Sequence, residues 1–232
     1  MSAQGTLPEI PGLQPLILVG MFDSPFVRRV AVSLRVLDIA FEHRNLSVGK
    51  DQAQIRALNP LGRVPVLVLP TGECLIESAM ILDHLDALAG PEHALLPPAG
   101  EGRRVAQQWL ALSAGAIDKG IQLVYEQVFR PQDKRHMPWI ERCLEQMHGA
   151  LAELDARCAA IAGNNWLVDG RIGQADITLA CVTTYLRDAV PVDLSPYPAL
   201  NARCEALEDL RPLREFYLPF EAPVPDALEA RA

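Results

Sequence analysis

Residues 59–78 of the chain read NPLGRVPVLVLPTGECLIES, and the organisation of the first half can be worked out from this stretch. Two strand candidates, at 64–69 and 73–76, flank a Pro-Thr-Gly sequence at 70–72. Proline and glycine in this order are typical of a tight turn, so the two runs predict a β-hairpin. Glu77-Ser78 follows directly, and the apolar residues after it recur at the spacing of a helix face. The stretch therefore predicts a strand, a turn, a second strand and a helix in succession.

The segment before the hairpin predicts a strand, a helix and a further strand. Residues 16–20 form a short continuous apolar run, which is typical of a buried strand. Ser24-Pro25 then opens a helix, and the alternating pattern of residues 40–46 indicates the second strand. A crossover this short implies a right-handed parallel pair. With a short helix at 51–58, the predicted order is βαβ, α, ββα.

A Pro- and Gly-rich stretch divides this half from a second half that reads as helical throughout. We place the boundary at 89–99, which gives an α/β domain at 14–90 and an all-α domain at 98–220. The helices of the second half are expected at about 103–130, 138–162, 174–190 and 198–209. The Pro- and Glu-rich tail from Pro219 onwards is expected to be loosely held.

The composition excludes several classes of protein. Of the 232 residues, 50% are hydrophobic and 22% are charged, which is the ordinary globular balance. The formal net charge is -8, so a basic surface for nucleic acid is not indicated, and docking on anionic membranes is disfavoured. No stretch approaches the roughly 18 apolar residues of a membrane span.

Five scattered cysteines form no CxxC motif, and their odd number argues against a disulfide framework. The first eight residues lack the basic start and apolar run of a signal peptide. We therefore expect a soluble cytoplasmic protein with reduced thiols.

The first motif that can carry chemistry is Ser24-Pro25, directly after the first strand. In its structural interpretation, serine caps the helix and proline occupies the first helical position. The functional interpretation notes that a helix start offers free N–H groups and a partial positive charge, which favour an anion such as a thiolate. The serine hydroxyl adds a hydrogen bond, so the two interpretations are compatible. The helix carries Arg28, Arg29 and Arg35 off its apolar stripe.

The second and third motifs are Val64-Pro65 and Glu77-Ser78. Pro65 is either a plain edge-strand proline or a cis-proline that exposes the Val64 backbone to an extended peptide ligand. Glu77 either complements the helix dipole or, with Ser78, holds the ammonium and carboxylate of an amino-acid head.

The layout of the three motifs resembles the thioredoxin-like domain of glutathione transferases, and the helical half after a Pro/Gly linker resembles their second domain. The similarity covers roughly residues 14–215. The segment at 24–28 is similar to the active-site segment of serine-type bacterial and plant tau-like members. The segment at 59–67 is similar to the family's cis-proline segment, and Glu77-Ser78 matches its Glu-Ser pair.

The resemblance implies glutathione as co-substrate, with Ser24 as the catalytic residue that stabilises its thiolate. It implies that Val64 pairs with the cysteinyl backbone and that Glu77 and Ser78 hold the γ-glutamyl end. The glutathione-binding residues implied are Phe26, Arg63, Val64, Glu77 and Ser78, with Pro65 as the structural cis-proline. Lys50 is a further candidate, beside Arg63, for the glycine carboxylate.

In the second half, residues 173–177 resemble the family's capping box at the start of a buried helix. Gly173 replaces the usual Ser or Thr, so only half of the reciprocal box is expected, from Asp176. Tyr125 and Phe129 are candidates for an acceptor pocket, although core packing is the commoner role for such residues. No metal-ligand spacing occurs among the five histidines and no phosphate-binding glycine motif is present, so neither metal nor nucleotide is expected.

The leading hypothesis is a homodimeric enzyme that conjugates glutathione thiolate to a small electrophile. The same scaffold also serves glutathione-dependent isomerases, dehalogenases and disulfide reductases, which remain alternatives. A non-catalytic binding or regulatory protein is a third alternative, since fold does not fix function. The matches at Ser24, Val64 and Glu77-Ser78 argue against it.

Overall fold

The computed structural model describes residues 15–163, 166–190 and 192–221. The first eight residues and the tail beyond 221, on which two of the expectations rest, lie outside this part. The chain divides into two compact units between Ala94 and Leu95. Each unit is described by itself.

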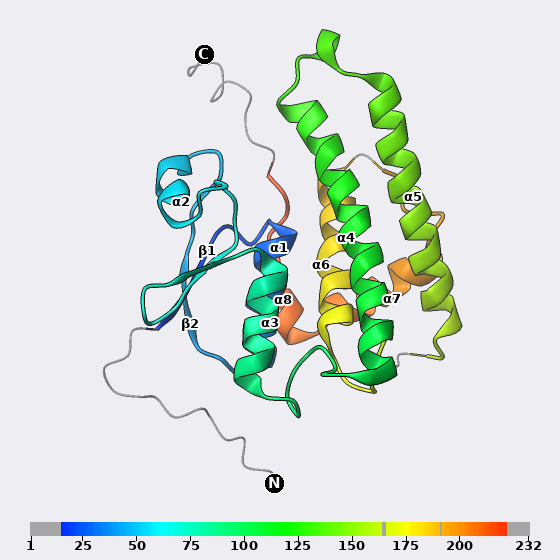
Figure 1. Ribbon diagram of the computed structural model, residues 1–232. Coiled ribbons are helices and arrows are strands. Elements are labelled where there is room, and N and C mark those ends of the chain that lie inside the picture. Colours follow the sequence, from blue (N-terminus) through cyan, green and yellow to red (C-terminus); the bar gives the residue numbers. More distant parts are fainter. Residues whose placement is uncertain (1–14, 164–165, 191, 222–232) are drawn as a thin grey trace. The chain divides into compact units, whose positions relative to one another are not determined.

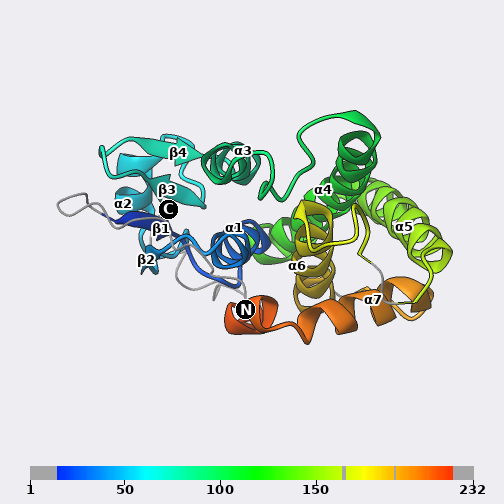
Figure 2. The ribbon, with the colours of Figure 1, turned by 90° about the horizontal axis from the view of Figure 1, so that it is seen from below.

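The first unit contains a four-stranded mixed sheet with the strand order β2-β1-β3-β4. Its elements are β1 (Leu16–Val19), α1 (Pro25–Val36), β2 (Phe41–Arg44), α2 (Gln52–Leu58), β3 (Val66–Val68), β4 (Cys74–Ile76) and α3 (Ser78–Ala89). As predicted, β1 and β2 are parallel and β3 and β4 form an antiparallel hairpin. In Figures 1 and 2, α1 and α3 lie side by side on one face of the sheet and α2 lies on the other. The predicted βαβ, α, ββα thioredoxin-like arrangement is confirmed.

Hydrophobic burial on both faces explains why these residues form a central sheet. Leu18 and Val19 of β1 are fully buried and so point into opposite layers. On one side Val19 packs with Leu46, Ile55 of α2 and Val66. Burial of such side chains contributes about 1.5–3 kcal/mol each.

Two of the three α1 arginines are buried, although all three lie off the apolar stripe. Arg28 and Arg29 are 3% and 8% exposed, whereas Arg35 is exposed. For Arg29 the reason is a polar contact, because its guanidinium donates to the hydroxyl of Ser78 at the start of α3. The sequence pattern separates apolar from polar positions but does not show that a polar position is covered by a neighbouring helix.

The second unit is helical throughout, as predicted. Its elements are α4 (Gly100–Val128), the 3₁₀ turn η1 (Gln132–Lys134), α5 (Met137–Ala160), α6 (Gln174–Ala189), α7 (Pro198–Glu208) and α8 (Arg211–Glu215). The two shortest, η1 and α8, were not expected, since neither is long enough to show a helical period. Figure 1 shows α4 and α5 as a long pair, with α6 packed beside α4.

The start of α6 explains the glycine at position 173. The Gly173 N–H donates to Asp176 Oδ2 at 3.0 Å, which confirms the predicted half of the capping box. A Cβ at Gly173 would lie 2.8 Å from the carbonyl oxygen of Leu95, so a serine or threonine would collide with backbone. Asp176 also accepts from the Leu167 N–H at 3.1 Å, and this second bond ties the preceding loop to the helix.

Candidate functional site

The three motifs predicted to act together lie at one edge of the sheet. Val19, Val66 and Ile76 form a single row across β1, β3 and β4. The chain leaves β1 just beyond this row towards Ser24, enters β3 through Val64-Pro65 and leaves β4 into Glu77-Ser78. The register of the sheet thus gathers three segments that are separate in sequence.

Gly20 brings the start of α1 against the segment before β3. Its φ is +131°, a backbone conformation that glycine adopts readily and other residues rarely do. A Cβ at this position would lie 2.6 Å from Val27 Cγ2 and 2.8 Å from Val64 Cβ. Only a residue without a side chain allows Val27 and Val64 to approach β1 this closely.

Ser24 caps α1 with its hydroxyl directed at the free end of the helix. The residue is extended, with φ -72° and ψ 122°, and its Oγ accepts from the Val27 N–H at 3.5 Å. This is a long hydrogen bond, so the cap is weak. Within the described residues the hydroxyl donates to no acceptor. Its proton is therefore available to a ligand atom placed at the helix start, where the dipole favours negative charge.

Val64 presents an unused backbone donor and acceptor. The Val64–Pro65 peptide bond is cis, as the resemblance implied. Neither the N–H nor the C=O of Val64 pairs with another described backbone group, since the ladder begins at Val66. The side chain is half-buried. A peptide laid along this edge would find one donor and one acceptor ready for it.

Asn59 holds the turn that leads to Val64. Its side chain is 1% exposed, and its amide donates to the Arg63 carbonyl at 2.8 Å while its oxygen accepts from the Leu61 N–H at 3.0 Å. Sequence reasoning included Asn59 in the motif but gave it no role. An asparagine before a proline is the available signal, because such pairs favour turns.

Glu77 and Ser78 differ sharply in exposure. Glu77 has φ +66°, which is unusual for a residue with a side chain, and it is exposed. Its carboxylate makes no hydrogen bond or ion pair with the described residues. Residues held in this conformation concentrate at functional sites. Ser78 is 2% exposed, and its Oγ accepts from Arg29 Nε at 3.1 Å and Nη2 at 2.6 Å.

Arg29 is the site residue that sequence reasoning missed. Its guanidinium links α1 to the start of α3, and it also lies 5.7 Å from the ring centre of Phe26. The partner serine is 49 residues away, so nothing local in the sequence pairs the two. The contact places a positive charge directly behind the hydroxyl of Ser78.

The remaining candidates are Phe26, Arg63 and Lys50. Phe26 is half-buried against Arg29, while Arg63 and Lys50 are both exposed. The Arg63 carbonyl is bound by Asn59, and the Lys50 N–H donates to the Ser47 carbonyl at 3.2 Å. The side chains of Lys50 and Arg63 make no hydrogen bond or ion pair within the described part of the chain. Both residues therefore remain candidates for the glycine carboxylate of glutathione.

The second unit has a pocket of its own at the end of α4. Its volume is about 430 Å³, and it is lined by Gln122, Tyr125, Glu126, Phe129, Arg130, Pro131 and Lys134. Tyr125 and Phe129, the two residues proposed for an acceptor pocket, are therefore brought together here. Their rings form an edge-to-face pair with centres 5.3 Å apart.

The five cysteines are free thiols, of which Cys74 is partly exposed and the other four are buried. Burial raises the pKa of Cys158 to about 11 and that of Cys204 to about 12, so both stay protonated and inert near neutral pH. No group of three His, Cys, Asp or Glu side chains suited to a metal is found among the described residues. In the same part of the chain, no helix is both long and apolar enough to cross a membrane.

Comparison with known proteins agrees with this fold. The family model described as the glutathione S-transferase N-terminal domain matches residues 18–93, and that of the C-terminal domain matches residues 137–217. An Escherichia coli protein, the uncharacterised GST-like protein YibF, is 32% identical over 174 residues. This alignment covers 73% of this chain and 81% of the relative. The chain belongs to the glutathione S-transferase family.

Two further relatives extend the comparison. A probable glutathione S-transferase of rice, GSTU1, is 30% identical over 184 residues and covers 73% of each chain. A glutathione S-transferase from Methylobacterium radiotolerans, solved in complex with glutathione sulfonate, superposes with a TM-score of 0.80 at 28% identity. That match covers 91% of this chain and 98% of the relative, so the transferase fold extends across both units.

Proposed function

We propose that this glutathione S-transferase family member conjugates the thiolate of glutathione to a small electrophile. The observations that carry the proposal are the unused N–H and C=O of Val64 and the Ser24 hydroxyl at the start of α1. The related transferase from Methylobacterium radiotolerans was solved with glutathione sulfonate, which is glutathione with its thiol oxidised.

In this proposal glutathione lies in an extended conformation across the end of the sheet where the three motifs meet. Its cysteinyl backbone pairs with Val64, and its γ-glutamyl end meets the start of α3. There the exposed Glu77 carboxylate takes the ammonium group, and the Ser78 hydroxyl donates to the carboxylate. The start of α1 and the positive charge of Arg29 supply local attraction for an anion in a protein of net charge -8.

Ser24 then acts on the sulfur. A hydrogen bond from its hydroxyl and the partial charge of the helix start stabilise the thiolate over the thiol, so the bound thiol loses its proton to solvent near neutral pH. The thiolate attacks the electrophilic carbon of the acceptor, where a C–S bond forms and the bond to the leaving group breaks. The thiolate matters because it is far more nucleophilic than the thiol.

The test is conjugation of 1-chloro-2,4-dinitrobenzene by the wild type and by Ser24→Ala, with exposed Ser195→Ala as the control. The proposal expects kcat/KM to fall about a hundredfold in Ser24→Ala and to stay unchanged in the control. Equal rates in all three proteins would overturn the role of Ser24. If the protein does not conjugate this compound but uses glutathione to reduce a disulfide or to isomerise a substrate, the reductase or isomerase alternative is favoured. Glutathione binding with no turnover would favour a regulatory protein.

The physiological setting is part of the proposal. We infer a cytoplasmic homodimer that detoxifies electrophiles, because the five cysteines form no disulfide and the family resemblance implies a dimer. Light scattering of the purified protein tests the assembly. A mass near twice the 25.4 kDa of one chain is expected, and a monomeric mass would contradict it.

A further inference from the structure

The pocket at the end of α4 combines an aromatic wall with basic side chains. Tyr125 and Phe129 are 50% and 49% exposed, which is unusual for large aromatic residues that stand together. Their edge-to-face arrangement leaves ring surface open to the pocket. A volume of about 430 Å³ falls within the range of small-molecule sites. This wall suits a flat aromatic ring.

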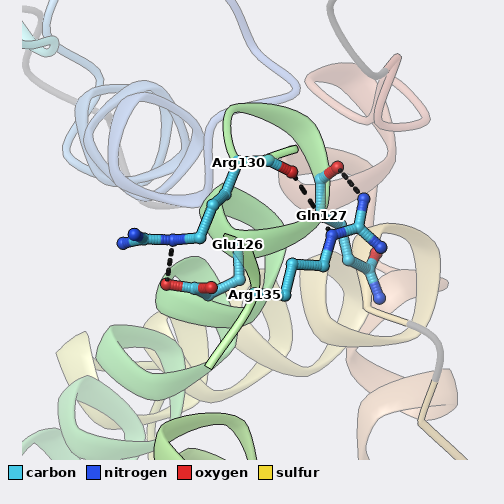
Figure 3. Close-up of polar contacts among 4 residues, drawn as sticks. All are labelled: Glu126, Gln127, Arg130 and Arg135. Atoms are coloured by element: carbon cyan, nitrogen blue, oxygen red, sulfur yellow. Dashed lines mark hydrogen bonds and ion pairs between the residues drawn. The ribbon is translucent and has the colours of Figure 1, made fainter. Parts of the chain in front are cut away.

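Arg130 faces the same pocket and is held by a buried carboxylate. Its Nε donates to Glu126 Oε1 at 2.8 Å, and the Glu126 side chain is 7% exposed while that of Arg130 is 51% exposed. Figure 3 shows the two terminal nitrogens of Arg130 pointing away from Glu126. No partner for these two nitrogens occurs among the described residues. They form a fork that matches the two oxygens of a carboxylate.

The charges of the pocket favour an anion. Glu126 and Arg130 neutralise each other, which leaves Lys134 as an additional positive charge at the rim. Lys134 forms no ion pair within the described ranges. Although the chain has a net charge of -8, the positive charges of this pocket attract a bound anion, because screening by salt weakens the more distant negative charges.

Arg135 fixes the position of Arg130 from the other side. Its Nη2 donates to the Gln127 carbonyl at 2.7 Å and its Nε donates to the Arg130 carbonyl at 3.3 Å (Figure 3). These bonds occupy carbonyl groups at the end of α4 that the helix itself leaves without partners. The backbone of Arg130 is thus restrained as well as its side chain, and a restrained cation loses less entropy when it binds.

We propose that this pocket binds a small aromatic acid, with its ring against Tyr125 and Phe129 and its carboxylate on the terminal nitrogens of Arg130.

A binding experiment tests the pocket without relying on catalysis. Calorimetry with 3,5-dinitrobenzoate and with the neutral 1,3-dinitrobenzene compares the same ring with and without the carboxylate. Arg130→Lys keeps a positive charge beside Glu126, which protects the fold, but removes the fork. We expect the affinity for the acid to fall about tenfold and that for the neutral ring to stay within about twofold. Arg104→Lys is the matched control, because Arg104 pairs with Glu101 at the opposite end of the same helix.

The outcomes of this experiment are distinct from those of the conjugation assay. Wild-type binding of the acid without conjugation of 1-chloro-2,4-dinitrobenzene would overturn the proposed transferase function and leave the pocket standing. Acid binding that is absent in the wild type, or equal in wild type and Arg130→Lys, would overturn the pocket. Equal melting temperatures confirm that the variants are folded.

Discussion

Arg29 of α1 donates two hydrogen bonds to the hydroxyl of Ser78 at the start of α3, from Nε at 3.1 Å and from Nη2 at 2.6 Å. A serine hydroxyl has two acceptor lone pairs and one proton. Because Arg29 occupies the lone pairs, the proton has to point elsewhere, and no described residue accepts it. The arginine thus orients the hydroxyl to donate to a ligand.

Replacing Arg29 should impair glutathione binding more than turnover. In Arg29→Lys a single ammonium replaces the fork, so we expect KM for glutathione to rise about tenfold while kcat changes less than about threefold. Steady-state kinetics with varied glutathione measure both. The exposed Arg35→Gln on the same helix should leave both constants unchanged.

The double variant with Ser78→Ala separates positioning from general damage to the fold. If Arg29 acts through Ser78, the effect of Arg29→Lys on KM should largely disappear once Ser78 is alanine. Fully additive effects of the two substitutions would contradict the positioning role.

Gly20→Ala should destabilise the first unit. The new Cβ would lie 2.6 Å from Val27 Cγ2 and 2.8 Å from Val64 Cβ, in a backbone conformation with φ +131°. We expect a loss of about 2–4 kcal/mol in the free energy of unfolding, measured by urea denaturation. Gly72→Ala is the control, because φ there is +85° but nothing lies within 4 Å of the added Cβ. It should cost about 1–2 kcal/mol, from backbone strain alone. A larger loss in Gly72→Ala than in Gly20→Ala would contradict the clash.

Thiol labelling should distinguish Cys74 from the other four cysteines. Cys74 in β4 is partly exposed, whereas Cys143, Cys158, Cys181 and Cys204 are buried. With Ellman's reagent at neutral pH, we expect one thiol to react quickly and the rest only on unfolding. In Cys74→Ser the fast phase should vanish. Any fast-reacting thiol in that variant would show that the helical unit is more open than the structure indicates.

Asp176 should give a pH dependence of stability. Burial raises the pKa of its carboxyl above the ordinary value of 3.8, although hydrogen bonds from the Leu167 and Gly173 N–H groups and the charge of Arg203 oppose the shift. The folded protein thus holds this proton more tightly than the unfolded chain. The stabilising contribution of the titration is complete below pH 3.8 and is lost as the pH rises through the folded-state pKa.

Asp176→Asn removes this titration together with one accepting oxygen, so it should cost about 1–3 kcal/mol. The difference in unfolding free energy between wild type and variant should be largest at low pH and should narrow as the pH rises. Asp193→Asn is a control of opposite sign, because bonds from Ser195 lower the pKa of Asp193. Its difference should widen with rising pH. If the difference in unfolding free energy between wild type and Asp176→Asn also widened with rising pH, the raised pKa of Asp176 would be contradicted.

The sequence predicted the order of elements well because each signal for it is local. The Pro-Thr-Gly turn, the Ser24-Pro25 helix start and the helical periods depend only on neighbouring residues. Strand β3 is shorter than the run at 64–69 that indicated it, since Pro65 has no N–H and the ladder begins at Val66.

The contacts within the site were less predictable because they join distant parts of the chain. Val64, Glu77 and Ser78 could be chosen as candidates from their motifs, but the burial of Arg29 and its bond to Ser78 depend on how α1 packs against α3. The same holds for the Arg130–Glu126 pair. Its i,i+4 spacing is common on helices, and only the fold shows that one partner is buried and the other open.

The measurement that tests the central claim most directly is the pKa of the glutathione thiol when bound to the protein. The ultraviolet absorbance of the thiolate, titrated against pH in saturating glutathione, reports it for the wild type and for Ser24→Ala. The account predicts a pKa at least about 1.5 units below the ordinary thiol value of about 8.5 in the wild type, and a return towards that value in the variant. The same bound pKa in both proteins would contradict the account.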